Sequence, residues 1–343
     1  MTKQQMIQFV LEYGNASQKY MIMRDVLNID KSNKEMLLLQ SDFIQLKAVK
    51  KMLNSQNEDG WFGNELHGGP MKAMDSTVIY LTEIGLEPTN SYLRKAKKAL
   101  LANANPDLKS GKVRLGFDRG YNYSNSVILA ALHLDGEELE NELKDAYTRI
   151  MELFEEGAKV TSLDEISKEC TRSKYIGQRV FLDDKFFPWI SDISVLARSN
   201  AWVSPMNKEI VQNAMKTVGK LMPIPNILEP FHGYYLGTIG NYLSLSQNDP
   251  LQLPKGDIVW WIRDIQNLCR ITDITHIPHF YNQVTMFKEY VMNNTLITSL
   301  SKDALKAFEN FYGYYNKWKN EIQVKTDIYY QALMILHLAG LDF

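Results

Sequence analysis

The sequence predicts an all-α protein built from helical hairpins that close into a ring. Leucine, isoleucine, valine and aromatic residues recur at helical spacing through most of the 343-residue chain. Alternating, strand-like runs bounded by hairpin dipeptides are almost absent. Glycines that can close a helix recur at a common interval, which indicates a repeated structural unit.

Two leading helices are expected within residues 1–30, at 3–13 and 17–28, with Gly14 and Asn15 as the break and Ser17 as the N-cap. From residue 35 onward the helices pair into six hairpins. The first helices of these hairpins are expected at 35–54, 92–103, 137–156, 207–221, 257–270 and 302–319. The second helices are expected at 70–84, 122–134, 188–199, 233–246, 280–293 and 326–339.

Three of the second helices end on the same pattern, with a leucine four residues before a glycine at Gly85, Gly136 and Gly340. Glycine suits the left-handed position that closes a helix. Gly85 and Gly136 are 51 residues apart, and Gly136 and Gly340 are 204 apart, which is four times 51. A period near 50 with two helices per unit indicates a solenoid or a closed helical ring, and we expect a single domain over residues 1–343.

Composition excludes several classes of protein. Hydrophobic residues at 45% and charged residues at 23% are ordinary globular values. A net charge of −2 without a basic run gives no reason to expect nucleic acid as a partner. No apolar run reaches the ~18 residues that span a bilayer. The chain begins without a signal-peptide pattern and carries two cysteines, Cys170 and Cys269, which favours a cytoplasmic location.

The stretch from Gln56 to Gly63, Gln-Asn-Glu-Asp-Gly-Trp-Phe-Gly, lies between two apolar helical patterns. Asp59 and Gly60 form a turn in this interpretation. Gln56 and Trp61 are expected to tie one helix to its neighbour by hydrogen bonding and packing. The stretch is therefore interpreted as a marker of the fold.

Residues 50–61 resemble the glutamine–tryptophan repeat of the squalene and terpenoid cyclases and of protein prenyltransferase β-subunits. The shared features are a basic helix end, Gln56, the acidic–glycine turn and Trp61, although the family's extra residue between glycine and tryptophan is missing. The repeat is clear once, with a fainter version at 110–121. The resemblance implies an α/α toroid, which agrees with the six hairpins.

In a ring of hairpins, all loops that join a first helix to its second helix open on one face. Polar and aromatic residues that converge there are what a ligand site needs, although loops also carry polar residues for no functional reason. Residues 157–188 are expected to form a long loop over the cavity. The candidate ligand-binding residues on this face are Trp61, His67, Arg119, Tyr121, Trp189, Tyr234, Tyr235, His276, His279 and Tyr281.

Asp183 and Asp184, adjacent to each other and flanked by aromatic residues, are candidate catalytic acids. Paired carboxyls beside apolar rings can raise the pKa of one of them toward neutrality. The resemblance points the same way, because class II terpene cyclases protonate an alkene with an Asp-x-Asp-Asp motif, but here Phe181 occupies the first position. The alternative is structural: both aspartates cap the following helix and pair with Lys185 or Arg179.

His276 and His279, with Asp273 and Cys269 nearby, have the residue types of a zinc site. Pro278 prevents a regular helix from presenting both rings, and the Asp, Cys and His set of the family's zinc-dependent members has no match here. We therefore expect no metal site, and the sequence names no cofactor.

The leading functional prediction is isoprenoid-type chemistry, as cyclase or transferase, on a small or mid-sized apolar ligand in the central cavity. A carbohydrate lyase or hydrolase on the same architecture is the alternative. The residue types for proton abstraction and charge neutralisation are then supplied by Arg119, Asn125, Tyr235 and the third catalytic candidate, His232. A non-catalytic binding or scaffold protein is the second alternative. The sequence does not predict the substrate or the oligomeric state.

Overall fold

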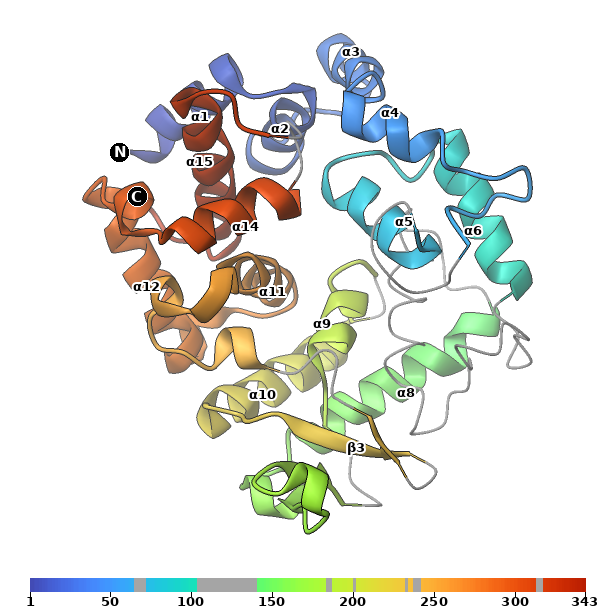
Figure 1. The fold of residues 1–343 in the computed structure, drawn as a ribbon, viewed down its shortest axis with the longest axis vertical. Helices are drawn as coiled ribbons and strands as arrows, with labels where there is room; N and C mark the ends of the chain where they lie inside the picture. Colours follow the sequence, from blue (N-terminus) through green and yellow to red (C-terminus); the bar gives the residue numbers. More distant parts are fainter. Residues whose placement is uncertain are drawn as a thin grey trace. The chain divides into compact units, whose positions relative to one another are not determined.

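The computed structural model is mostly helical, which confirms the all-α prediction at the level of fold class (Figure 1). It describes residues 1–64, 72–103, 141–182, 187–199, 202–231, 234–236, 242–312 and 317–343. The chain divides into two compact units. Unit 1 comprises Met1–Leu108, Leu253–Ile262 and Val284–Phe343, and unit 2 comprises Lys109–Gln252 and Arg263–Gln283. The closed ring and the single domain remain predictions.

The regular elements of unit 1, over its described residues, are helices joined by turns, with one isolated β-bridge between Gln56 and Phe62. Its elements are α1 (Lys3–Tyr13), α2 (Ala16–Met21), the π-helical turn η1 (Ile22–Val26), α3 (Lys34–Phe43), α4 (Lys47–Leu53), α5 (Met74–Glu83), α6 (Ser91–Asn103), η7 (Pro254–Gly256), α13 (Leu296–Ser299), α14 (Lys302–Tyr312) and α15 (Glu321–Leu338). Two further helices, α11 (Ile258–Ile271) and α12 (Pro278–Met292), run from one unit into the other.

Unit 2 combines helices with a small sheet. Its helices and 3-10 turns are α8 (Asn141–Gly157), η3 (Leu163–Glu165), η4 (Ser173–Tyr175), α9 (Ile190–Leu196), α10 (Pro205–Leu221), η5 (Leu243–Leu245), η6 (Pro250–Gln252) and η8 (Ile274–His276). Its strands are β1 (Ser167–Glu169), β2 (Arg179–Phe181), β3 (Ile227–Phe231) and β4 (Tyr234–Leu236).

The two leading helices form where the sequence places them, with one correction. The prediction for 3–13 coincides with α1, and Thr2 and Gln5 form a capping box at its start. The N-cap of α2 is Asn15, whose side chain accepts from the backbone N–H of Gln18, so the prediction of Ser17 as the cap is wrong. Ser17 is instead buried and donates its hydroxyl to the carbonyl of Ile84, which fixes α2 to the end of α5.

The four-stranded sheet is the main departure from the predicted helices. Its order is β1-β2-β3-β4, with β2 and β3 parallel and the other pairs antiparallel. The helix expected at 233–246 is wrong, because this part of the chain holds β4 and the turn η5. The segment 157–188 contains β1 and β2, and Cys170 and Val180 pack on Leu228 of β3 to give it a small core. Its predicted position over a cavity stays a prediction.

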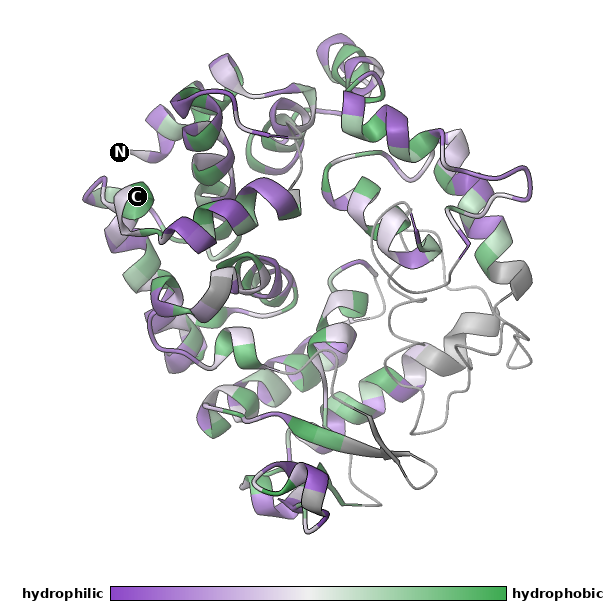
Figure 2. Cartoon of the chain, viewed as in Figure 1, coloured by the Kyte–Doolittle hydropathy of each residue, from purple (hydrophilic) through white to green (hydrophobic). Residues whose placement is uncertain are grey.

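The cores are built from the apolar faces of amphipathic helices. Figure 2 shows hydrophobic and hydrophilic residues mixed along each helix. In unit 1, α1 packs on α15 and α2 packs on α3, and α15 is buried almost continuously from Ile328 to Leu336. In unit 2, α8 packs on α10. No helix of the described ranges is both long and apolar enough to cross a membrane.

Glycines close two of the three helices for which the sequence predicts it. Gly85 and Gly340 have φ angles of 106° and 66°. In each case the next N–H turns back to a carbonyl five residues earlier, from Leu86 to Leu81 at 2.9 Å and from Leu341 to Leu336 at 3.0 Å. This pattern satisfies the free carbonyls of a helix end. Gly136 lies outside the described residues.

The Gln56 stretch has the linking geometry predicted for it. The amide of Gln56 donates to the carbonyl of Gly60 at 3.0 Å and to that of Tyr92 at 2.9 Å, so it joins the end of α4 to the start of α6. Asp59 accepts from the backbone N–H of Trp61 at 2.9 Å, as expected for an acidic turn. The buried aromatic residue is Phe62, whereas Trp61 is partly exposed.

Substitution of Gly60 tests this turn. Gly60 has a φ of 99°, and a Cβ there would lie 2.7 Å from the carbonyl oxygen of Lys95 in α6. Gly177 also has a positive φ, 82°, but a Cβ there would meet nothing within 4 Å. Chemical denaturation is expected to show that Gly60→Ala costs about 1–3 kcal/mol more than Gly177→Ala, since only the first adds a clash to the backbone strain. Equal losses would mean that α6 does not press on this turn.

Candidate functional site

Several of the predicted site residues fall outside the described parts of the chain. These are the candidate catalytic residues Asp183, Asp184 and His232 and the candidate ligand-binding residues His67, Arg119 and Tyr121. Their roles stay predictions. Tyr234 and Tyr235 lie on strand β4 and not at the start of a helix.

Trp189 and Trp61 are placed by local contacts. Trp189 is buried and meets the ring of Phe181 edge-on, with centroids 5.0 Å apart. Its backbone N–H donates to Asp192 at 2.8 Å, so it also forms the N-cap of α9. Trp61 belongs to the turn after α4. Packing accounts for the position of Trp189, and ligand binding by either residue stays a prediction.

The two histidines near residue 277 have separate partners. His276 is exposed, and its Nδ1 lies 3.0 Å from Asp273 Oδ2. His279 places Nε2 2.7 Å from the carbonyl oxygen of Leu245, and Tyr281 is partly buried on the same helix. Burial raises the pKa of the Cys269 thiol to about 12. Over the described ranges, no three His, Cys, Asp or Glu side chains gather closely enough to hold a metal ion.

The most unusual group of unit 1 is the carboxyl of Asp327, on the second turn of α15. It is only 2% exposed. Gln18 Nε2 donates to Oδ1 at 2.6 Å, and the indole Nε1 of Trp318 donates to Oδ2 at 2.5 Å. Burial raises the pKa of Asp327 to about 7, although both hydrogen bonds favour the charged form. At neutral pH this carboxyl therefore populates both its protonated and its ionised states.

The elements around Asp327 are fixed by their own caps. Asn320 caps α15 by accepting from Gln323 N at 3.0 Å, which sets where Asp327 falls on the helix. The cap of α2 at Asn15 sets the position of Gln18 in the same way. The backbone N–H of Trp318 donates to Glu309 of α14 at 2.7 Å, which holds the chain just before α15. The acid is thus held from two other parts of unit 1, α2 through Gln18 and the segment before α15 through Trp318.

Tyr80 of α5 is the second ring near this acid. Its pKa is raised above the ordinary tyrosine value, first by burial and then by the negative charges of Asp327 and Glu83. Tyr80 is therefore a neutral phenol throughout the pH range in which Asp327 changes its charge. Tyr80 and Trp318 are partly exposed, whereas Asp327 and Gln18 are buried. The four side chains form what we call the Asp327 centre.

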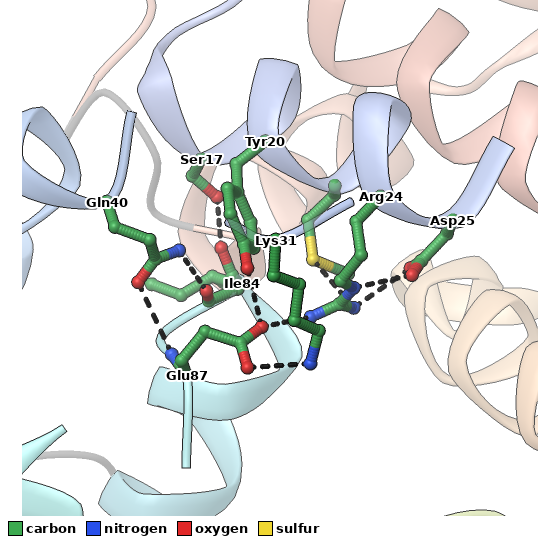
Figure 3. Close-up of polar contacts among 10 residues, drawn as sticks. Ser17, Tyr20, Arg24, Asp25, Lys31, Gln40, Ile84 and Glu87 are labelled. Carbon is green, nitrogen blue, oxygen red and sulfur yellow. Dashed lines mark hydrogen bonds and ion pairs between the residues drawn. The ribbon is translucent and has the colours of Figure 1, made fainter. Parts of the chain in front are cut away.

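A second polar cluster in unit 1 is a matched set of charges around Glu87 (Figure 3). Glu87 accepts from Tyr20 at 2.7 Å, from Arg24 at 3.1 Å and from Lys31 at 2.8 Å. Arg24 also makes two hydrogen bonds to Asp25, at 2.6 and 3.0 Å. Although burial opposes the charge of Arg24, Asp25 and Glu87 raise its pKa above the usual range.

This cluster has a structural role. It connects η1 to the loop between α5 and α6, where Gln40 of α3 also donates to the carbonyl of Gly85 at 2.7 Å. Burial disfavours the charge of Glu87, but the hydrogen bonds from Lys31 and Tyr20 hold its pKa below the ordinary value. Arg24 and Lys31 balance the charge of Glu87, so this cluster stabilises the fold. The Asp327 centre is therefore the candidate functional site.

Substitution of Glu87 is expected to destabilise the protein at neutral pH. Glu87→Gln removes the negative charge that Arg24 and Lys31 share, and a loss of about 1–3 kcal/mol is expected. A lowered carboxyl pKa stabilises the fold above the unfolded-state value and loses this effect as the pH falls through the folded-state value. The difference between wild type and Glu87→Gln in chemical denaturation should therefore shrink at acid pH. Glu35→Gln, on the exposed face of α3, is the matched control and is expected to change little.

Unit 2 has buried polar side chains that also tie elements together. Ser244 of η5 donates to Asp264 of α11 at 2.5 Å, and Asn267 donates to Ser194 of α9 at 3.1 Å. The hydroxyl of Tyr242 donates to the carbonyl of Pro188 at 2.8 Å. Burial raises the pKa of Tyr242 well above its ordinary value, so this phenol stays neutral.

Sequence reasoning missed the Asp327 centre because Gln18 and Tyr80 are far in the chain from Asp327, and only Trp318 is near it in sequence. No spacing rule joins these three parts of the chain. One signal was present: Asp327 opens an apolar run that continues to Leu338, and a carboxyl on an otherwise buried helix face is informative.

Comparisons with protein-family models, with curated proteins and with solved structures give no match to this chain. The resemblance to the cyclase and prenyltransferase family stays a prediction from the Gln56 stretch and from the helical hairpins expected in the sequence.

Proposed function

We propose that this protein is an enzyme of the α/α-toroid type that binds a small or mid-sized apolar ligand, of isoprenoid type, and transfers a proton to it from Asp327. The observation that carries the proposal is the buried carboxyl of Asp327, whose pKa of about 7 makes it a proton donor at neutral pH. This acid takes the role that the sequence analysis gives to Asp183 and Asp184.

The surroundings of Asp327 suit chemistry on an apolar ligand. The acid is shielded from water, so a proton that it releases is not lost to solvent at once. When the O–H bond of the acid breaks and a C–H bond forms on an alkene, a carbocation and a carboxylate result. The indole of Trp318 and the phenol of Tyr80 are neutral rings close to the acid, and aromatic rings stabilise a nearby cation. Loss of a proton from the carbocation to the carboxylate restores the acid.

The test combines ligand identification with isotope incorporation. Native mass spectrometry of the purified protein is expected to find an apolar molecule bound. Turnover of isoprenoid alkenes and their diphosphates in heavy water is expected to place one deuterium in the product. Asp327→Asn should lower the rate at least ~10²-fold, as for the loss of a general acid, whereas Asp42→Asn on the exposed side of α3 should not. Full activity of Asp327→Asn, or product without deuterium, would refute the proposed role of the acid.

A further inference from the structure

The two hydrogen bonds that hold Asp327 differ in how firmly their donors are fixed. Gln18 is buried, and its side-chain carbonyl accepts from the backbone N–H of Asn15 at 3.1 Å, so its amide is held at both ends. The indole of Trp318 is only a donor, its hydrogen bond goes to Asp327, and its side chain is partly exposed. When Asp327 becomes neutral, both donors lose a charged acceptor, but Gln18 stays in place through the cap of α2.

We propose that Trp318 is a proton-controlled latch on Asp327, bound firmly by the carboxylate and held weakly by the neutral acid. Hydrogen bonds to an ionised acceptor are roughly twice as strong as those between neutral groups, so protonation removes about half of the latch. The latch also explains why a partly exposed tryptophan is aimed inward at a carboxyl that is itself 2% exposed.

The geometry limits the movement to the side chain of Trp318. Its backbone N–H is held by Glu309 at 2.7 Å, and the next backbone N–H, of Lys319, is held by Gln323 at 2.7 Å. Neither contact involves Asp327. A weakened latch therefore lets the indole turn about its own bonds while the chain stays in place. Because Trp318 is partly exposed and Asp327 is buried, a turn of the indole away from Oδ2 removes one of the two hydrogen-bond donors that hold the carboxyl.

Other ionisable groups lie on the elements whose residues interact with Asp327 or Trp318. On α5 they are Tyr80, which stays neutral, and Glu83. On α14 the group is Glu309. The neighbouring cations are Lys317 and Lys319, which are exposed, and Lys19 of α2, which is 3.4 Å from the carbonyl of Glu12.

His337 is the described histidine of unit 1. It lies ten residues along α15 from Asp327, which is about 15 Å at 1.5 Å per residue. Its Nε2 donates to the carbonyl of Asp25 at 2.9 Å, and its Nδ1 is 3.4 Å from Lys3 Nζ. The variant His337→Gln therefore tests whether this histidine contributes to a pH-dependent change at Trp318.

The latch is independent of the proposed function, because it requires no substrate. If both proposals hold, Trp318 binds Asp327 weakly when the acid is protonated. The protonated acid is also the form that can donate a proton. The test uses protein without ligand. An indole signal that does not move refutes the latch alone, whereas a midpoint near the ordinary aspartate value also contradicts the proton donor.

The latch is tested by NMR of the indole N–H groups in ¹⁵N-labelled protein, with Trp318→Phe to assign the signal of Trp318. In wild type the ¹H signal of Trp318 is expected at low field at about pH 8.5, and to move upfield as the pH is lowered to about 5.5, with a midpoint near 7. Its exchange with water should become faster over the same range. A signal that does not move, or one with a midpoint near the ordinary aspartate value, would overturn the proposal.

Three variants show which group drives the change. Asp327→Asn should fix the Trp318 signal at a position that no longer depends on pH. Glu309→Gln changes the backbone contact of Trp318 and should leave the titration in place, as should His337→Gln. If Asp327→Asn does not fold, the side-chain carboxyl ¹³C signal of Asp327 in wild type decides the matter, since its midpoint must coincide with that of the indole. Loss of the titration in His337→Gln would overturn the latch.

Discussion

Trp261→Ala is expected to lower the free energy of unfolding by about 3–5 kcal/mol, the usual cost of truncating a large buried aromatic side chain. Trp261 is fully buried on α11 and packs on Phe287 of α12 with ring centroids 5.1 Å apart. Alanine would leave a cavity in the core of unit 1, which neighbouring side chains fill only in part. Urea denaturation followed by circular dichroism measures the loss.

Trp260 is the matched control, because it is the preceding residue on the same helix. It is 45% exposed and meets Phe311 of α14 edge-on with centroids 4.8 Å apart. Trp260→Ala removes this ring pair but about half as much buried area as Trp261→Ala, so a clearly smaller loss is expected. Equal losses for the two substitutions, or a larger loss at Trp260, would show that α11 presents the opposite face to the core.

Asp327→Asn is expected to remove a pH dependence of stability that wild type has. The folded protein keeps the proton of Asp327 up to a pKa of about 7, whereas the unfolded chain releases it near 3.8. Between these values the folded state binds more protons, so the contribution of Asp327 to stability is full below the lower pKa and falls as the pH rises through the higher one. The total change is about 4 kcal/mol, at about 1.4 kcal/mol per pH unit.

Chemical denaturation at several pH values measures this effect as a difference between wild type and Asp327→Asn. From about pH 5.5 to about 8.5, the variant is expected to gain about 2 kcal/mol relative to wild type. Asp42→Asn, at an exposed position of α3, should show no such gain. If the two variants follow the same pH profile, the carboxyl of Asp327 is ionised in the folded protein throughout the range.

Helices could be predicted from the sequence because their signals are local. The apolar spacing and the cap at Thr2 predict the bounds of α1. The helix expected at 207–221 lies within α10, which begins at Pro205 after the N-cap Ser204. The helix expected at 35–54 forms as α3 and α4, with a turn between them. No glycine or proline stands at this interruption, so the sequence contains no helix-breaking residue that would predict it.

The strands could not be predicted from the sequence because they are too short to show an alternating pattern. β1, β2 and β4 have three residues each, and β3 pairs with residues far away in the chain. Apolar runs of three to five residues occur in both strands and helices, so their pattern does not distinguish the two. Pro223, Pro225 and Pro230 disfavour a helix before residue 231, which was the available evidence for an extended segment.

The sequence predicts a carboxyl beside aromatic rings at Asp183 and Asp184, from their adjacency. These two residues lie outside the described parts of the chain, so this stays a prediction. In the described parts of unit 1 the same combination occurs at Asp327, where Trp318 is local but Gln18 is 309 residues away. A contact between residues so far apart in the chain depends on the tertiary arrangement of α2 and α15. Spacing patterns in the sequence do not predict that arrangement.

The proton donor and the latch both depend on the ionisation of Asp327. A ¹³C NMR titration of its side-chain carboxyl, assigned with Asp327→Asn, measures this ionisation directly. The signal is expected to change with a midpoint near pH 7, because burial outweighs the hydrogen bonds from Gln18 and Trp318. A midpoint near 4, the value of an exposed aspartate, would contradict both the proton donor and the latch.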